Sequence, residues 1–403
     1  MSKNTLPAIW LLILLIALPQ ISETAYAPSL PDIANYMSVS DSIAEYTLTV
    51  FLFGFALGTL FWGKVSDRFG RRPCMLISLC IFALGCVGCY FSSSIEMLLT
   101  FRFIQAFGGS TGSVLGQAIC RDAFHGSQRG KVFSTVGSLI AFSPAIGAAL
   151  GGMIDQLFGW TAIFVFLIIA SLLTLIMTYF NLPETHVPSN VSLVSISHTA
   201  WKMLRDKHVL ACGFLVGAAN GIAISYYAEG SFYLIEMLGL NPWEYGISFL
   251  GAACAGAIGG YISRRLQDRM TPVLIIRHGA GLILLGSTIF AFMTLVFAIV
   301  EAGQVASIIL TLASMMIITA GISMSIPNVL SCALENYRHA IGTASSLFGF
   351  YYYNIIALFS FGMGWLHNGT LLPMPFYLWA IAISFWIVFI KFINKKKNGS
   401  NGT

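Results

Sequence analysis

The strongest constraint on this chain is a series of long apolar segments that recurs along nearly its whole length. Each is about 20 residues long, enough for a helix to cross a hydrocarbon core ~30 Å thick. Only 9% of the 403 residues are charged and 57% are hydrophobic, whereas soluble domains carry roughly 25% charged residues. The segments do not alternate apolar and polar residues as barrel strands do, so helices are the expected spanning elements.

The segments predict an all-α membrane protein with twelve transmembrane helices. The first six are expected near 6–27, 42–63, 74–92, 97–119, 132–154 and 160–181, and the second six near 209–235, 245–263, 273–299, 303–327, 341–364 and 374–393. The boundaries follow as an N-terminal six-helix bundle at 1–181, a linker at 182–208, a C-terminal six-helix bundle at 209–394 and a tail at 395–403. Two such halves with a midplane site between them form a known transporter architecture.

The basic residues predict the orientation in the membrane. All but one of the 21 Lys and Arg fall at the end of the predicted helices that carries both termini. Loops rich in Lys and Arg stay in the cytoplasm, so we expect a multi-pass protein of a bacterial inner membrane with both termini in the cytoplasm. The formal net charge of +5 is then a consequence of topology, and no nucleic-acid partner is expected. The exception is Arg102, inside a predicted helix.

Several other sequence patterns resemble functional motifs but do not fit them. Ala25-Tyr26-Ala27 resembles a signal cleavage site, but cleavage would leave eleven helices and contradict the charge pattern of the later loops. Gly58-x-x-x-x-Gly63-Lys64 has phosphate-loop spacing, yet it ends in Val65 and lies in a membrane helix. Cys86-x-x-Cys89 lacks further metal ligands, and the seven His lie in loops or near helix ends. We therefore expect no enzyme activity, no metal and no cofactor.

The most specific motif follows the second predicted helix and reads Gly63-x-x-x-Asp67-Arg68-x-Gly70-Arg71-Arg72. Its glycines permit a close approach and a tight turn, and Asp67 can bind an Arg or a helix N-terminus. The motif resembles the signature loop of the major facilitator superfamily. This resemblance implies two pseudo-symmetric six-helix bundles and a gating role for the loop. A weak echo at 260–265 has Arg264 where Asp67 stands, so an Asp-based latch is expected in the first half only.

Two further segments are similar to the drug:proton antiporters of that superfamily, and most to the bicyclomycin-resistance (Bcr/CflA) branch. They are Arg102-x-x-Gln105-Ala106-x-Gly108-Gly109, and Ser143-Pro144-Ala145-Ile146-Gly147 followed by Gly151-Gly152. The resemblance implies an antiporter hinge made of Pro144, Gly147, Gly151 and Gly152. A proline inside a helix removes one backbone bond, and a fixed bend is the alternative reading.

Three ionisable residues stand out inside predicted helices, Glu23, Arg102 and Glu229. A charge at the bilayer centre costs roughly 2.5–3.5 kcal/mol, so such groups normally face a cavity or a partner. We predict a role in proton coupling, with an ion pair that locks the helices as the alternative. Because the first and seventh helices are equivalent, Glu23 and Glu229 are expected to face each other, and Glu229 either attracts a cationic cargo or serves as a second proton site. The remaining cavity candidates are Tyr26, Gln105, Asn220, Tyr226, Tyr227 and Asn354.

The sequence thus predicts a monomeric proton-coupled antiporter that exports small molecules, such as drugs, antibiotics or secreted metabolites, by alternating access. A proton that moves inward through 100 mV releases ~2.3 kcal/mol, enough for about a 50-fold gradient, so the proton gradient suffices as the energy source. An ion-coupled importer with the same fold is the first alternative. A non-transporting membrane receptor or scaffold is the second.

Overall fold

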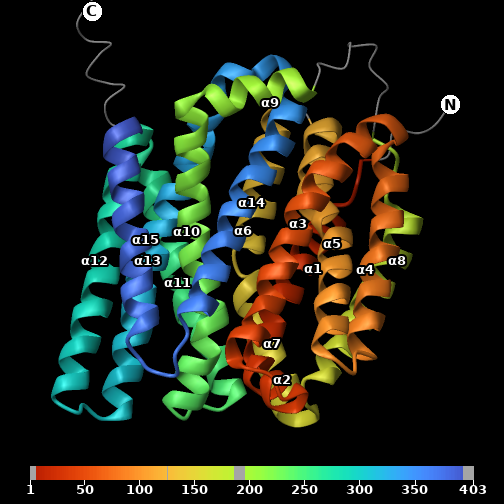
Figure 1. Ribbon diagram of the computed structural model, residues 1–403. Coiled ribbons are helices and arrows are strands. Elements are labelled where there is room, and N and C mark those ends of the chain that lie inside the picture. The colour runs from red at the N-terminus through yellow and green to blue at the C-terminus, as the bar shows by residue number, and fades with distance from the viewer. Residues whose placement is uncertain (1–5, 125, 186–195, 394–403) are drawn as a thin grey trace, which may run out of the picture.

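The computed structural model describes residues 6–124, 126–185 and 196–393, and every regular element within these ranges is helical. The predicted tail at 395–403 and positions 186–195 of the predicted linker lie outside the described residues. Figure 1 shows long helices that run side by side between two ends of the molecule. The end with α9 and the loop between α3 and α4 is called the basic face, and the opposite end, with α2, is called the acidic face.

The helices match the predicted segments closely, with two additions and one interruption. The N-terminal set comprises α1 (Ile9–Tyr26), α2 (Leu30–Met37), α3 (Asp41–Phe69), α4 (Arg71–Tyr90), α5 (Ile95–Ala123), α6 (Gly126–Ile140), α7 (Ser143–Phe158) and α8 (Thr161–Asn181). The C-terminal set comprises α9 (Ile196–Arg205), α10 (Lys207–Ser231), α11 (Pro242–Leu266), α12 (Pro272–Ile299), α13 (Gln304–Ala333), α14 (Ile341–Leu366) and α15 (Pro373–Val388). The additions are α2, which extends the first segment, and α9, which lies in the predicted linker.

Ten helical segments of the described residues are long and apolar enough to cross a membrane. The two predicted spans missing from these ten are explained by their sequences. Helix α5 is 29 residues long, but Arg102, Gln105 and several glycines lower its hydropathy. The predicted span at 132–154 is interrupted at Ala141 and Phe142, which separate α6 from α7.

Proline accounts for the interruption between α6 and α7. Pro144 is in the first turn of α7, where its missing N–H removes no intrahelical bond. The sequence predicts one kinked helix here, whereas the structure has two shorter helices, α6 and α7.

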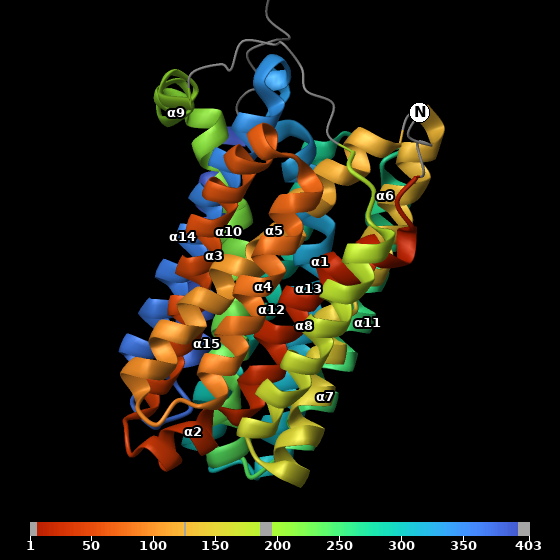
Figure 2. The ribbon, with the colours of Figure 1, turned by 90° about the vertical axis from the view of Figure 1, so that its right-hand side faces the viewer.

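The N-terminal and C-terminal sets meet along two seams. One seam is between α3 and α14, and the other is between α7 and α11. Figure 2 shows α3 and α14 on one side of the molecule and α7 and α11 on the other. At the second seam Gly152 lies against the backbone of Pro242, so that the two helices approach at backbone distance.

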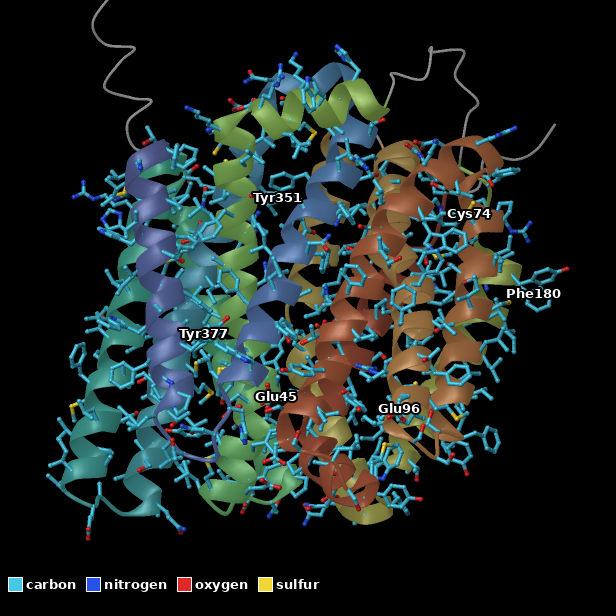
Figure 3. All side chains as sticks on the ribbon, in the orientation of Figure 1. Glu45, Cys74, Glu96, Phe180, Tyr351 and Tyr377 are labelled. Atoms are coloured by element: carbon cyan, nitrogen blue, oxygen red, sulfur yellow. The ribbon has the colours of Figure 1, made fainter. Side chains whose placement is uncertain are left out.

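The outer surface of the helices is apolar, as a bilayer requires. On α8, Ile169 is 54% exposed and Phe180 is 77% exposed, and Figure 3 shows Phe180 pointing away from the bundle. An apolar surface of this extent would be a liability in water but is solvated by lipid tails. The chain is a multi-pass membrane protein.

Candidate functional site

Arg102 lies in the interior of the N-terminal helices and has no solvent exposure. Its Nη1 donates a 2.7 Å hydrogen bond to Oε1 of Gln105, one turn later on α5. The guanidinium carbon is 4.2 Å from the ring centroid of Tyr26 and 4.2 Å from that of Phe51. Two aromatic faces thus stabilise the buried charge by cation–π attraction, while Nε and Nη2 have no hydrogen-bond partner among the described residues.

Glu23 lies on α1, one turn before Tyr26. Its Oε1 is buried without a hydrogen-bond partner among the described residues, and Arg102 acts on its carboxyl electrostatically. Gln105 Nε2 donates a 3.1 Å bond to Ser22 Oγ, which joins α5 to α1 beside Glu23. The structure therefore brings four of the predicted residues together, Glu23, Tyr26, Arg102 and Gln105. A carboxyl with a free oxygen near a guanidinium can take up and release a proton.

A second polar cluster joins the two sets of helices near the acidic face. Glu229 on α10 is 1% exposed, and its Oε1 and Oε2 are 3.1 and 2.9 Å from Nδ1 of His367, just beyond α14. The other ring nitrogen of His367, Nε2, is 3.1 Å from Oδ2 of Asp41 on α3. One imidazole therefore connects a carboxylate of the N-terminal set to a carboxylate of the C-terminal set.

Glu45 completes this acidic-face cluster, which is defined by Asp41, Glu45, Glu229 and His367. Glu45 has no solvent exposure, and neither of its carboxylate oxygens has a hydrogen-bond partner among the described residues. One ligand atom each from Glu45, Glu229 and His367 lie within 4.8 Å of one another. Figure 3 shows Glu45 where α3 passes α14. The sequence predicted that Glu229 faces Glu23, whereas the carboxylate beside Glu229 is that of Glu45.

The contacts of His367 raise its pKa above the ordinary value of 6.5. The hydrogen bond with Glu229 is the main cause, the charges of Glu229 and Asp41 add to it, and burial opposes it. The pKa of His367 therefore favours an imidazolium that two carboxylates hold in place.

The predicted gating loop forms a network within the N-terminal set of helices. Arg71 makes ion pairs of 2.7 Å with Asp67 and 3.1 Å with Asp122. Glu184 accepts the backbone N–H groups of Arg71 and Arg72 at 3.0 and 3.1 Å, so that it caps the start of α4. The backbone of Gly70 has a φ of 98°, a conformation that a side chain would strain. The guanidinium of Arg68 packs over the ring of Phe69.

Gly63 of the same motif contacts the other set of helices. A Cβ atom added at Gly63 would overlap Oγ of Ser346 on α14. A side chain at position 63 would therefore require Ser346 on α14 to move.

The predicted hinge glycines lie on two faces of α7, and each face packs against a different helix. Gly147 and Gly151 lie against the backbone of α1 at Ile21 and Ala25. Gly152 lies against α11 of the other set, as described above. Helix α7 is thus positioned between the two sets, immediately after the break in the chain, and its role as a hinge remains a prediction.

The other cavity candidates lie in packed surroundings. Tyr226 is 2% exposed, and Tyr227 places its ring 4.9 Å from that of Phe249. Asn220 and Asn354 donate bonds of 2.9 and 2.7 Å to carbonyl groups of their own helices. In this conformation the side-chain NH₂ groups of both Asn residues are bound within their own helices.

Long apolar helices in two packed sets, with buried ionisable groups between them, define a polytopic membrane transporter. The family model of the Major Facilitator Superfamily matches residues 12–361, and the chain belongs to this superfamily. It is 34% identical to an uncharacterized transporter of Rickettsia bellii, over 96% of this chain and 97% of that one. It is 27% identical to a bicyclomycin resistance protein homolog of Haemophilus influenzae, over 94% of each. A solved D-xylose–proton symporter has the same fold, with a TM-score of 0.70 and 17% identity over 96% of this chain and 97% of that one.

The sequence alone does not point to Asp41, Glu45 or His367 as members of a site. Glu45 lies within the predicted span 42–63. An acidic side chain inside a membrane span needs a partner, and this was the one sign in the sequence that Glu45 belongs to a site. His367 was placed in a loop after its helix. Nothing in the sequence relates positions 45, 229 and 367, because their proximity depends on how α3 packs against α14.

Proposed function

We propose that this chain is a proton-coupled antiporter that exports small molecules across the bacterial inner membrane, as a monomer and by alternating access between its two halves. The main support for the proposal is that Glu23, Tyr26 and Arg102 lie together in the interior of the N-terminal half. A carboxyl oxygen without a hydrogen-bond partner lies near a guanidinium that no carboxylate neutralises within 4.0 Å among the described residues. Such a carboxyl is suited to exchange a proton when the halves move.

The direction of transport and the cargo class rest on the relatives. One relative is named for resistance to bicyclomycin, and others are named as multidrug resistance proteins, which suggests the export of drugs or similar metabolites. The basic face is assigned to the cytoplasm because Lys and Arg cluster there. Both termini would then be cytoplasmic.

The proposal is tested in proteoliposomes with an imposed pH gradient and labelled bicyclomycin as the first probe. Glu23→Gln removes the proposed proton site while it keeps the size of the side chain. Accumulation driven by the gradient should fall at least about tenfold, the scale of one lost interaction of ~1.4 kcal/mol, while exchange without a gradient survives. Glu96→Gln is the matched control, since Glu96 is an exposed acid of the same half.

Three results would count against the proposal. Undiminished proton-driven transport in Glu23→Gln would assign Glu23 to structure. Accumulation in the direction of the proton flow would instead support the importer. Specific binding of the probe without any flux would support a receptor.

A further inference from the structure

We propose that Glu45, Glu229 and His367 form a binding site for a divalent transition-metal ion, of which Zn²⁺ fits best. The site lies outside the Glu23–Arg102 group and does not depend on the proposed direction or energy source of transport. It joins the two halves of the molecule near the acidic face.

The buried carboxylates of Glu45 and Glu229 would be stabilised by a cation. Glu45 and Glu229 are 0% and 1% exposed, and their carboxylates approach each other with no Lys or Arg within 4.0 Å among the described residues. Glu229 is paired with His367, but Glu45 has no cationic partner among the described residues, and burial of an unpaired charge is costly. One divalent ion with two carboxylates and a neutral imidazole makes the group electrically neutral.

The unpartnered carboxylate of Glu45 points to a ligand that this group would hold. Both of its oxygens are buried, and neither accepts a hydrogen bond from a donor group among the described residues. The neighbouring carboxyl group is that of Glu229, close enough to share a proton with it, and one Glu45 oxygen is within 4.8 Å of the nearest ligand atoms of Glu229 and His367. Ligand atoms around a tetrahedral zinc ion are ~3.3 Å apart. The pair from His367 and Glu229 is already at 2.9 Å, so a shift of at most about 1.5 Å by Glu45 would close the site.

Asp41 orients the imidazole for this purpose. Its Oδ2 is 3.1 Å from Nε2 of His367, and in the tautomer that donates this hydrogen bond, the lone pair of Nδ1 faces Glu229. A carboxylate that binds the far N–H of a metal-ligating histidine is a common second partner in zinc sites. His367 thus has the arrangement of a ligand, with Asp41 as a positioning residue.

The three ligands, two carboxylates and one imidazole, favour some metal ions over others. One imidazole and two carboxylates suit Zn²⁺, with a fourth position left for water. Mg²⁺ and Ca²⁺ require six or more oxygen ligands and would bind poorly to three groups. Because Glu45 belongs to one half and Glu229 and His367 to the other, a bound ion would hold the acidic face closed. We therefore expect Zn²⁺ added on that side to inhibit transport.

The binding test uses the purified full chain in detergent, stripped of metal with EDTA and held at about pH 8 so that His367 gives up its proton more readily. Titration with ZnCl₂ should raise the melting temperature progressively with concentration, by about 3 °C at a hundredfold excess over Kd. One ion per chain should bind in calorimetry. MgCl₂ at the same concentration should have no effect.

Substitutions locate the ion. Glu45→Gln, Glu229→Gln and His367→Gln should each abolish the zinc-dependent rise, and Asp41→Asn should weaken binding about 10–100-fold. Glu301→Gln and His278→Gln are the matched controls, because both residues are exposed and lie outside the cluster, and they should bind as the native chain does. The melting temperature of each variant without metal shows whether it is folded.

Two results would overturn the proposal. An equal rise in the native chain, in Glu45→Gln and in His367→Gln would mean that Zn²⁺ binds elsewhere. The second result has two parts. The melting temperature would not rise up to about 1 mM ZnCl₂, and acid would stabilise the protein in a way that depends on Glu45, Glu229 and His367. The group would then bind protons and no metal ion.

Discussion

The two ends of the molecule hold the halves together by different chemistry. At the basic face the printed ion pairs of Arg71 with Asp67 and Asp122, and its backbone bond to Glu184, join residues of the N-terminal half. Among the described residues, one contact across the halves there is the packing of Gly63 on Ser346. At the acidic face the charged groups themselves cross from one half to the other, through His367. A contact made by packing is indifferent to protons and ions, whereas a buried carboxylate–imidazole contact responds to both.

The acidic-face cluster should therefore be the more costly one to break. His367→Ala leaves three carboxylates near one another, two of them fully buried, and should lower the free energy of unfolding by about 3 kcal/mol. Thermal unfolding of the metal-free protein in detergent measures the effect. His278→Ala, at an exposed position, should change it by less than ~0.5 kcal/mol. Equal effects of the two variants would show that the cluster contributes no more than a surface histidine.

The basic-face contact should respond to volume and not to charge. Gly63→Ala places a Cβ on Oγ of Ser346 and should slow transport about tenfold, which corresponds to ~1.4 kcal/mol. Ser346→Ala in the same chain should restore most of the rate, because it removes the overlapping atom. Gly260→Ala is the matched control, since no heavy atom lies within 4 Å of the added Cβ. If the double variant stays as slow as Gly63→Ala, the overlap is not the cause.

The charges of the basic face should matter least. Asp67→Asn removes one of the two ion pairs of Arg71, which keeps Asp122 at 3.1 Å. Because Asp67 is 38% exposed, the loss of stability should be below ~1 kcal/mol. Turnover should fall about threefold with an unchanged apparent affinity for cargo. A native rate in this variant would remove the latch role from Asp67.

The same contrast explains what the sequence could and could not predict. The helices were predictable because each depends on a continuous apolar run, and the basic loop because its residues are within ten positions of one another. Glu23 and Arg102 could be singled out as candidates because each is a rare charge in an apolar run. The acidic-face cluster was not, because Asp41, Glu45, Glu229 and His367 come from three distant segments. The sequence does not predict the break before Ser143, because a proline does not distinguish a bent helix from two helices.

The central claim is that the two faces open alternately, and distances between spin labels test it directly. One label pair would replace Tyr36, which is 69% exposed, and Asn368 at the acidic face. The other would replace Phe69, which is 63% exposed, and Glu335 at the basic face. The exposed Cys80 and Cys254 would be replaced beforehand.

Distance distributions would be recorded at about pH 8 and about pH 5, with and without bicyclomycin. We expect that a condition that lengthens the acidic-face distance shortens the basic-face distance, and the reverse. Two distances that remain fixed under all conditions, or that lengthen together, would contradict alternating access in this protein.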